Sequence, residues 1–229
     1  VLVPADQLEV VPDLDAGVWK QSPKLGDGVE QLTDLRVVRV VVALGMAVGD
    51  GGVAVRLDGE DITGLSPQDR VARGMGFVPQ NNNIFTSMTV EENLEMGAFI
   101  RRDDFSGTMA QVYDLFPILK EKRNQAAGEL SGGQRQQVAV GRALMTQPKV
   151  LMLDEPTAGV SPIVMDELFD RIIEIARTGI PILMVEQNAR QALAIADRGF
   201  VLVQGRNAYT GTGKELLADP EVRRSFLGG

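Results

Sequence analysis

The sequence predicts an α/β fold with a mainly helical insert. Short apolar runs of strand length at 76–80, 150–153 and 182–186 alternate with stretches that carry helix-start and helix-stop residues. The chain has 229 residues, of which 44% are hydrophobic, so it can form one α/β domain with a sizeable core. Residues 1–55 depart from this pattern.

Composition excludes several classes of function. The chain has no Cys and no His, which rules out disulfides, thiolate metal sites, His-based zinc sites and His-based catalytic triads. Its net charge of −8 argues against a nucleic-acid surface. No apolar run approaches the roughly 20 residues that cross a bilayer, and no signal core opens the sequence. We therefore expect a cytosolic protein whose membrane role, if it has one, comes through a partner.

The elements after the first segment are short and bounded by turn residues. Alternation over 53–57 predicts a strand that ends in a turn at 58–59. Ser66 and Pro67 then provide an N-cap with proline at the first helical position, and Gly74 is placed to close the short helix.

Residues 81–130 predict a helical insert. Thr89 and Glu92 have the spacing of a capping box, which opens a helix through about Ile100, and a second helix is expected over 107–116. The side chains expected to face inward are Val90, Leu94, Ala98, Met109, Val112, Tyr113 and Phe116.

The last part of the chain returns to alternating helices and strands. Ser161, followed by proline, is an N-cap for a helix that Gly179 closes. Strands over 200–204 and 207–210 are expected to finish the sheet as a hairpin, and a helix over 214–217 follows.

A candidate anion site begins at residue 131. Ser131 can cap a helix that runs to Met145, and Gly132 and Gly133 let a phosphate approach the backbone, with Gln134 in the first turn. Unpaired N–H groups and the helix dipole favour negative charge at such a position.

A pair of carboxylates follows the apolar run 150–153. Asp154 and Glu155 stand at the expected end of that strand. One carboxylate can hold Mg²⁺ through its water shell, and the next can polarise an attacking water. This chemistry is that of phosphoanhydride hydrolysis.

In this order and spacing, the motifs resemble those of the ATP-binding subunits of ABC transporters. The stretch 130–134 resembles the ABC signature, 149–155 a Walker B strand with its catalytic glutamate, and 158–161 the D-loop. The resemblance implies a RecA-like P-loop NTPase core with a mainly helical ABC subdomain, bound ATP and Mg²⁺, and ATP hydrolysis. It divides the chain into an atypical segment 1–55, a core made of 56–80 and 131–229, and a helical subdomain 81–130.

The resemblance also assigns roles to individual residues. Gln80 matches the Q-loop glutamine, which reaches Mg²⁺ and the attacking water, and Gln187 stands where most members carry a switch histidine. A Gln there can donate a hydrogen bond to phosphate but carries no charge. Because two subunits sandwich two nucleotides in this family, one set of residues serves the nucleotide of the same subunit and another that of the partner. The first set is Gln80, Asp154, Glu155 and Gln187, and the second is Ser131, Gly132, Gly133 and Gln134.

The stretch 186–189 is similar to that of branched-chain amino acid importers, in which the Gln is usual. This implies an importer subunit for branched-chain or other hydrophobic amino acids, peripheral to the inner face of the plasma membrane. The implied partners are a second ATP-binding subunit, which is a copy of this chain or a different one, and membrane permease subunits, with no nucleic acid and no direct membrane insertion. Candidates for the permease groove are Phe85, Met88 and Met96.

Residues 1–55 contain no Walker A pattern Gly-x-x-x-x-Gly-Lys-Ser/Thr. The segment is rich in Val and contains no Ile, Asn, Phe or Tyr, and a strand is expected within 36–44. The glycine-rich stretch 45–52 lacks Lys and hydroxyl groups, and Asp50 would repel phosphate. The stretch 211–214 has Glu215 where a hydroxyl is required, so both are interpreted as turns.

Three explanations of this gap remain. The segment is an out-of-frame translation of a normal gene, or the chain is a degenerate subunit that lends its signature loop to a competent partner, or it is a defective product with an incomplete sheet. A separate class, the ABC ATPases of DNA repair, places a long coiled coil between Q-loop and signature, and no heptads occur between Gln80 and Leu130.

Overall fold

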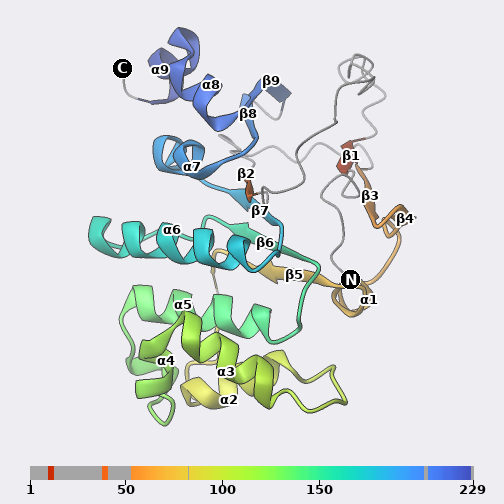
Figure 1. The fold of residues 1–229 in the computed structure, drawn as a ribbon, viewed down its shortest axis with the longest axis vertical. Coiled ribbons are helices and arrows are strands. Elements are labelled where there is room, and N and C mark those ends of the chain that lie inside the picture. Colours follow the sequence, from red (N-terminus) through yellow and green to blue (C-terminus); the bar gives the residue numbers. More distant parts are fainter. Residues whose placement is uncertain (1–9, 13–37, 41–52, 82, 204–205, 228–229) are drawn as a thin grey trace.

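A four-stranded parallel sheet forms the centre of the protein (Figure 1). The computed structural model describes residues 10–12, 38–40, 53–81, 83–203 and 206–227. The order β2-β7-β6-β5 is set by pairs such as Val38 with Ile182, Leu151 with Ile182, and Met75 with Val150. The strands are β2 (Val38–Val40), β5 (Met75–Val78), β6 (Val150–Asp154) and β7 (Ile182–Val185).

Because these strands are parallel, their carboxyl ends lie at one edge of the sheet. The chain leaves β5 at Val78, β6 at Asp154 and β7 at Val185 on that edge. The strand β2 confirms the one expected within 36–44, and it ends at Val40 on the same edge. The stretch 45–52 lies outside the described residues.

Two long helices connect the sheet to the rest of the fold, α5 (Gly132–Leu144) and α6 (Pro162–Arg177). Both have buried faces with helical spacing, which join the main core. Gly179, at φ +99°, closes α6 as expected, but Ser161 makes no side-chain cap hydrogen bond. Ser161 is the N-cap residue and proline follows at the first helical position, as expected, although the Ser161 side chain accepts no hydrogen bond from the helix.

The helices between residues 90 and 129 lie together beyond α5, at the lower end of Figure 1. Thr89 and Glu92 form the expected capping box. The first helix stops at Gly97, before the expected end near Ile100. A Cβ at Gly97 would lie 2.1 Å from the Arg142 carbonyl oxygen of α5, so only glycine permits this approach of the two helices. The elements are α2 (Val90–Gly97), α3 (Ser106–Leu115), α4 (Pro117–Glu121) and η2 (Ala127–Glu129).

Most of the side chains expected to face inward in this group are buried. Val90, Leu94, Ala98, Val112 and Phe116 are each at most 2% exposed. Met109 and Tyr113 are partly buried and pack against the same core. The division of the chain into core and helical subdomain remains a prediction.

A small antiparallel sheet of order β1-β3-β4 lies beside the parallel one. The turn at Asp58 and Gly59 connects β3 to β4, and Gly74 closes the following helix at φ +108°, both as expected. Ser66 caps that helix by accepting from the Asp69 backbone N–H. The elements are β1 (Val10–Pro12), β3 (Val53–Leu57), β4 (Glu60–Asp61) and α1 (Pro67–Ala72).

The C-terminal hairpin forms, but among the described residues it does not extend the parallel sheet. β8 and β9 pair only with each other there, with a register irregularity between Val201 and Leu202. Such a bulge bends a strand and interrupts its pairing. The expected completion of the sheet is thus wrong for this part of the chain. The elements here are α7 (Ala189–Ile195), β8 (Gly199–Val203), β9 (Arg206–Gly211), α8 (Gly213–Ala218) and α9 (Pro220–Phe226).

Candidate functional site

The sheet edge brings together three of the predicted site residues. Gln80 follows β5, Glu155 follows β6, and Gln187 follows β7. The Glu155 carboxylate accepts a hydrogen bond from Gln80 Nε2 at 2.6 Å on one oxygen and from Gln187 Nε2 at 2.9 Å on the other. Residues 75 and 32 positions apart from Glu155 thus meet on one carboxylate.

The Glu155 backbone has an unusual conformation. Its φ is +44°, in the left-handed region that non-glycine residues adopt at a cost of about 1–3 kcal/mol. The Glu155 N–H donates to the Val185 carbonyl at 2.9 Å, which ties this peptide to the end of β7. The sheet therefore holds the carboxylate in place beyond the strand end.

A second, buried carboxylate lies under this cluster. Glu186 is 1% exposed and accepts from Thr157 Oγ1 at 2.5 Å and from Asn188 Nδ2 at 3.0 Å. The backbone N–H groups of Thr157 and Asn188 also point at this carboxylate, at 3.4 and 3.3 Å. Glu186 thus ties the segment after Glu155 to the segment that carries Gln187.

Sequence reasoning did not single out Thr157, Glu186 or Asn188. Glu186 and Asn188 directly flank Gln187, and a carboxylate at the end of a buried strand was the signal that could have found the first. Asn83 was also missed. It is buried and its Nδ2 donates to the Pro79 carbonyl at 3.2 Å and to Gln136 Oε1 of α5 at 2.9 Å.

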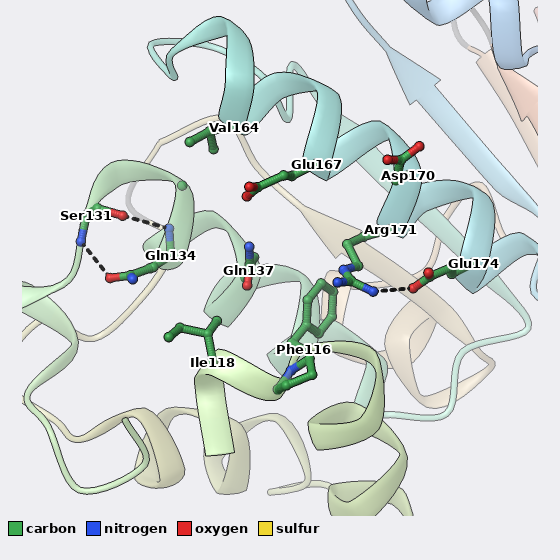
Figure 2. A pocket seen from close by; sticks show the side chains of 12 residues that line it. Phe116, Ile118, Ser131, Gln134, Gln137, Val164, Glu167, Asp170, Arg171 and Glu174 are labelled. Atoms are coloured by element: carbon green, nitrogen blue, oxygen red, sulfur yellow. Dashed lines mark hydrogen bonds and ion pairs between the residues drawn. The ribbon is translucent and has the colours of Figure 1, made fainter. Parts of the chain in front are cut away.

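The anion-site residues lie at the start of α5. Ser131 Oγ accepts from the Gln134 backbone N–H at 3.3 Å, and Gln134 Oε1 accepts from the Ser131 N–H at 3.1 Å (Figure 2). The expected N-cap is confirmed, and the reciprocal bond from Gln134 makes it a capping box. These side chains are therefore fixed relative to the helix N-terminus.

The two glycines at this position serve different purposes. A Cβ on Gly132 would meet no atom within 4 Å, so the space beside its backbone is open. A Cβ on Gly133 would lie 2.1 Å from Val164 Cγ1, so this glycine permits the close packing of α5 on α6. The interpretation of both glycines as openings for phosphate was thus incomplete for Gly133.

The Glu155 cluster and the anion site remain separate. Among the described residues no hydrogen bond or ion pair joins Glu155 or Gln187 to Ser131 or Gln134, while Asn83 connects the loop after β5 to α5.

Asp154 lies half-buried beside Glu155. In the part of the chain that the structure describes, no group of three or more acidic side chains is placed to hold a metal without further ligands.

Comparison with known proteins places this arrangement in a family. The ABC transporter family matches residues 45–158. BraG of Pseudomonas aeruginosa, a high-affinity branched-chain amino acid transport ATP-binding protein, is 45% identical over 177 residues, 77% of this chain and 76% of BraG. LivF of Archaeoglobus fulgidus, a probable branched-chain amino acid transport ATP-binding protein, is 36% identical over 97% of this chain and 94% of its own.

Two further proteins that resemble this chain are also ATP-binding proteins. LptB of Escherichia coli, an ATP-binding protein of lipopolysaccharide export, is 36% identical over 82% of this chain and 78% of LptB. The ADP conformation of MJ1267, an ATP-binding cassette of an ABC transporter, matches with a TM-score of 0.71 and 26% identity over 85% of this chain and 89% of that one. The fold is that of P-loop NTPases.

The chain belongs to the family of ABC transporter ATP-binding proteins. By this family resemblance it is an ABC-type ATP hydrolase.

Proposed function

We propose that this protein is the ATP-binding and ATP-hydrolysing subunit of an ABC importer for branched-chain or other hydrophobic amino acids. The names of BraG and LivF support the solute class. The observation that carries the chemical part is the Glu155 carboxylate held between the Gln80 and Gln187 amides at the sheet edge.

In this proposal Glu155 is the general base. Its carboxylate takes a proton from water as the water oxygen bonds to the terminal phosphorus of ATP and the bond from that phosphorus to the bridging oxygen breaks, which releases ADP. Gln187 Nε2 turns from Glu155 to donate a hydrogen bond to the terminal phosphate. Gln80 leaves the same carboxylate and offers its amide oxygen near Asp154. Both amides are within 3 Å of Glu155 before any nucleotide binds.

The residues beside Glu155 fit a Mg²⁺ ion. Mg²⁺ is usually bound in such sites by one or two carboxylates together with waters and phosphates, so it does not need the acidic trio that the described residues lack. Asp154, through water, and the Gln80 amide oxygen would be its ligands from this chain. When bound, Mg²⁺ supplies positive charge against the charge that develops on the phosphates.

The anion site at α5 would serve the nucleotide of a second ATP-binding subunit. The Ser131 and Gly132 end of this helix is exposed, and its capping box holds Ser131 and Gln134 in place. Ile163, at the start of α6, is 75% exposed, as expected for a side chain that a partner covers. Replacing Ser131 by Arg should therefore abolish hydrolysis by the dimer. Unchanged hydrolysis would contradict a shared site.

An exposed apolar patch is the proposed contact with the permease. Phe85 and Met96 are 45% and 38% exposed, and Phe99 and Ile100 beside them are 79% and 49% exposed. The Phe85 ring stacks with the Arg142 guanidinium, 5.0 Å from the ring centroid. Met88 is partly buried and contributes less than expected.

Buried Asn93 holds the loop that carries Phe85. Its Oδ1 accepts from the Phe85 N–H at 2.7 Å, and its Nδ2 donates to the Phe85 and Thr89 carbonyls, each at 2.9 Å.

No helix among the described residues is long and apolar enough to cross a membrane. The relationship to the transport ATP-binding proteins BraG and LivF supports the proposed location at the inner face of the plasma membrane, reached through the permease.

The alternative is a degenerate subunit that only lends its signature loop to a partner. The missing Walker A pattern favours it, because loss of the Lys and the backbone cradle removes charge-assisted hydrogen bonds of about 1.5–3 kcal/mol each. Translating the other reading frames of codons 1–60 distinguishes the cases. A Walker A pattern in another frame supports an ordinary ATPase, and its absence from all frames supports the degenerate subunit.

The proposed function is tested by reconstitution. The full chain is assembled with its permease in vesicles, and uptake of labelled leucine is measured with ATP on the side of this subunit. We expect uptake that depends on ATP and is competed by isoleucine and valine, but not by glutamate. Uptake of a charged solute in place of leucine would contradict the solute class.

A further inference from the structure

A pocket of about 490 Å³ lies between α4, the start of α5 and α6 (Figure 2). Its floor is apolar, formed by Phe116, Pro117 and Ile118. Its walls come from α5 and α6 and are polar. The volume falls within the range of roughly 300–1,000 Å³ that is typical of small-molecule sites. The rim touches Ser131 and Gln134, but neither Glu155 nor Gln187 lines the pocket.

Gln137 indicates that this pocket takes a polar ligand. Its side chain is only 9% exposed, and the described residues offer its amide no hydrogen-bond partner. Figure 2 shows the amide between α5 and α6, facing the pocket. Unlike the buried Gln136 Nε2, which has no partner among the described residues, the Gln137 amide atoms open to the pocket, where water or a ligand bonds to them. A ligand in the pocket would take the place of that water.

Charges of both signs lie on the opposite wall. Glu167 and Arg171 are four residues apart on α6, so they share one face with Cβ atoms roughly 6 Å apart. The Glu167 carboxylate points toward Gln137 in Figure 2 and forms no ion pair among the described residues. Arg171 uses Nη1 on Glu174 at 2.6 Å, and the remaining N–H groups of its guanidinium are available.

We propose that this pocket binds a free α-amino acid with an apolar side chain. Its ammonium group contacts Glu167, its carboxylate contacts Arg171, and the Gln137 amide bonds to either group between them. Its side chain covers Phe116 and Ile118. The spacing of Glu167 and Arg171 suits a zwitterion, whose two charges are separated by one carbon atom. The proposal goes beyond the proposed function, which assigns no solute-binding site to this subunit.

Binding here would act on the first turn of α5. Gln137 lies one helical turn after Gly133, and Ser131, Gly133 and Gln134 form the rim of the pocket. A ligand that joins Gln137 to Glu167 would fix α5 against α6 at the position where Gly133 meets Val164. It would therefore regulate the presentation of the anion site.

The test is titration calorimetry of the full chain with L-leucine, without nucleotide. 3-Methylbutylamine lacks the carboxylate, 4-methylpentanoate lacks the ammonium group, and L-aspartate replaces the apolar side chain with a charged one. We expect leucine to bind and each analogue to bind at least tenfold more weakly, about 1.4 kcal/mol. Leucine binding that is undetectable at millimolar concentration, or equal binding of the amine, would overturn the proposal.

Variants locate the site. Glu167→Gln and Gln137→Met should each weaken leucine binding at least tenfold, while Asp166→Asn, a neighbour on α6 outside the pocket, should leave it unchanged. Unfolding of each variant by urea verifies its folding, and exposed Glu167 provides the decisive variant if Gln137→Met is unstable. Unchanged binding in Glu167→Gln would overturn the assignment. The titration contains no nucleotide, so its result does not depend on whether the protein hydrolyses ATP.

Discussion

Gln187 donates a hydrogen bond to Glu155, with Nε2 and Oε1 2.9 Å apart. The first residue follows β7 and the second follows β6, so adjacent parallel strands bring them together. This contact keeps the Gln187 amide within reach of any phosphate that approaches Glu155. It also makes Gln187 a donor without charge, whose contribution can be tested by substitution.

Replacing Gln187 by Ala should lower the rate of ATP hydrolysis about tenfold or more, since one hydrogen bond to a charged group is worth about 1.5–3 kcal/mol. Replacing Gln187 by His should give a rate of hydrolysis equal to or above that of the original protein near pH 6, where imidazole is largely protonated. The measurement is steady-state phosphate release at saturating ATP. Equal rates for Gln187→Ala and the original protein would contradict the assigned role.

The adjacent glycines of α5 should respond differently to the same substitution. Gly133→Ala should lower the free energy of unfolding by about 1–3 kcal/mol, because its Cβ would lie 2.1 Å from Val164 Cγ1. Gly132→Ala meets no atom within 4 Å and should leave stability nearly unchanged. Urea unfolding measures both.

A double-mutant cycle provides the control for Gly133. If steric contact with Val164 is the cause, Val164→Ala should recover most of the stability that Gly133→Ala loses. Additive losses in the double variant would show that the contact is not responsible.

Glu186 should contribute to the stability of the fold as well as to the position of the segment that carries Gln187. Glu186→Ala leaves the buried Thr157 hydroxyl without its acceptor, at a cost of about 1–3 kcal/mol, while the Asn188 amide keeps its hydrogen bond to Thr157 Oγ1. Glu186→Gln, which keeps one acceptor oxygen, should lose less. Thermal unfolding of the two variants checks the order, and a smaller loss in Glu186→Ala would contradict the account.

Acidification should lower the stability of the fold, in part because it protonates the Glu92 carboxylate in the capping box of α2. The Thr89 backbone N–H and hydroxyl donate to Glu92, which lowers the pKa of this carboxyl below its ordinary value of 4.5. A lowered pKa in the folded state means that the stabilisation is present above pH 4.5 and is lost as the pH falls through the folded value. The Thr212 capping box lowers the pKa of Glu215 in the same way.

Urea unfolding between pH 7 and pH 3 tests this linkage. Glu92→Gln should show a smaller loss of stability on acidification than the original protein. Glu221→Gln, whose carboxylate pairs with exposed Arg224, serves as the control. Identical pH profiles for Glu92→Gln and the original protein would rule out a contribution from Glu92.

Local features of the fold could be predicted because they depend on residues close in sequence. The capping box at Thr89 and the N-cap at Ser131 each span three residues, and Gly74 and Gly179 close helices through their own positive φ. The family resemblance assigned Gln80, Glu155 and Gln187 to one nucleotide, and their hydrogen bonds bring them together, while their roles stay predictions.

Features that depend on strand register or on which face of a strand is covered could not be predicted. The Glu186 contact with Thr157 spans 29 residues, and that of Asn83 with Gln136 spans 53. Phe77 lies in the apolar run 76–80 but is 51% exposed, whereas Met75 and Val78 of the same strand are buried. An apolar run does not show which face of a strand the rest of the fold leaves uncovered.

Glu155→Gln tests the proposed role of Glu155 as the general base. The variant and the original protein, each in a competent version that carries a Walker A pattern, are compared for ATP binding and for phosphate release in a single turnover, with Glu221→Gln as the control. The account predicts that Glu155→Gln retains ATP affinity and loses hydrolysis by about 10²–10⁴-fold, the usual contribution of a general base. Retained hydrolysis at the original rate would show that another group activates the water.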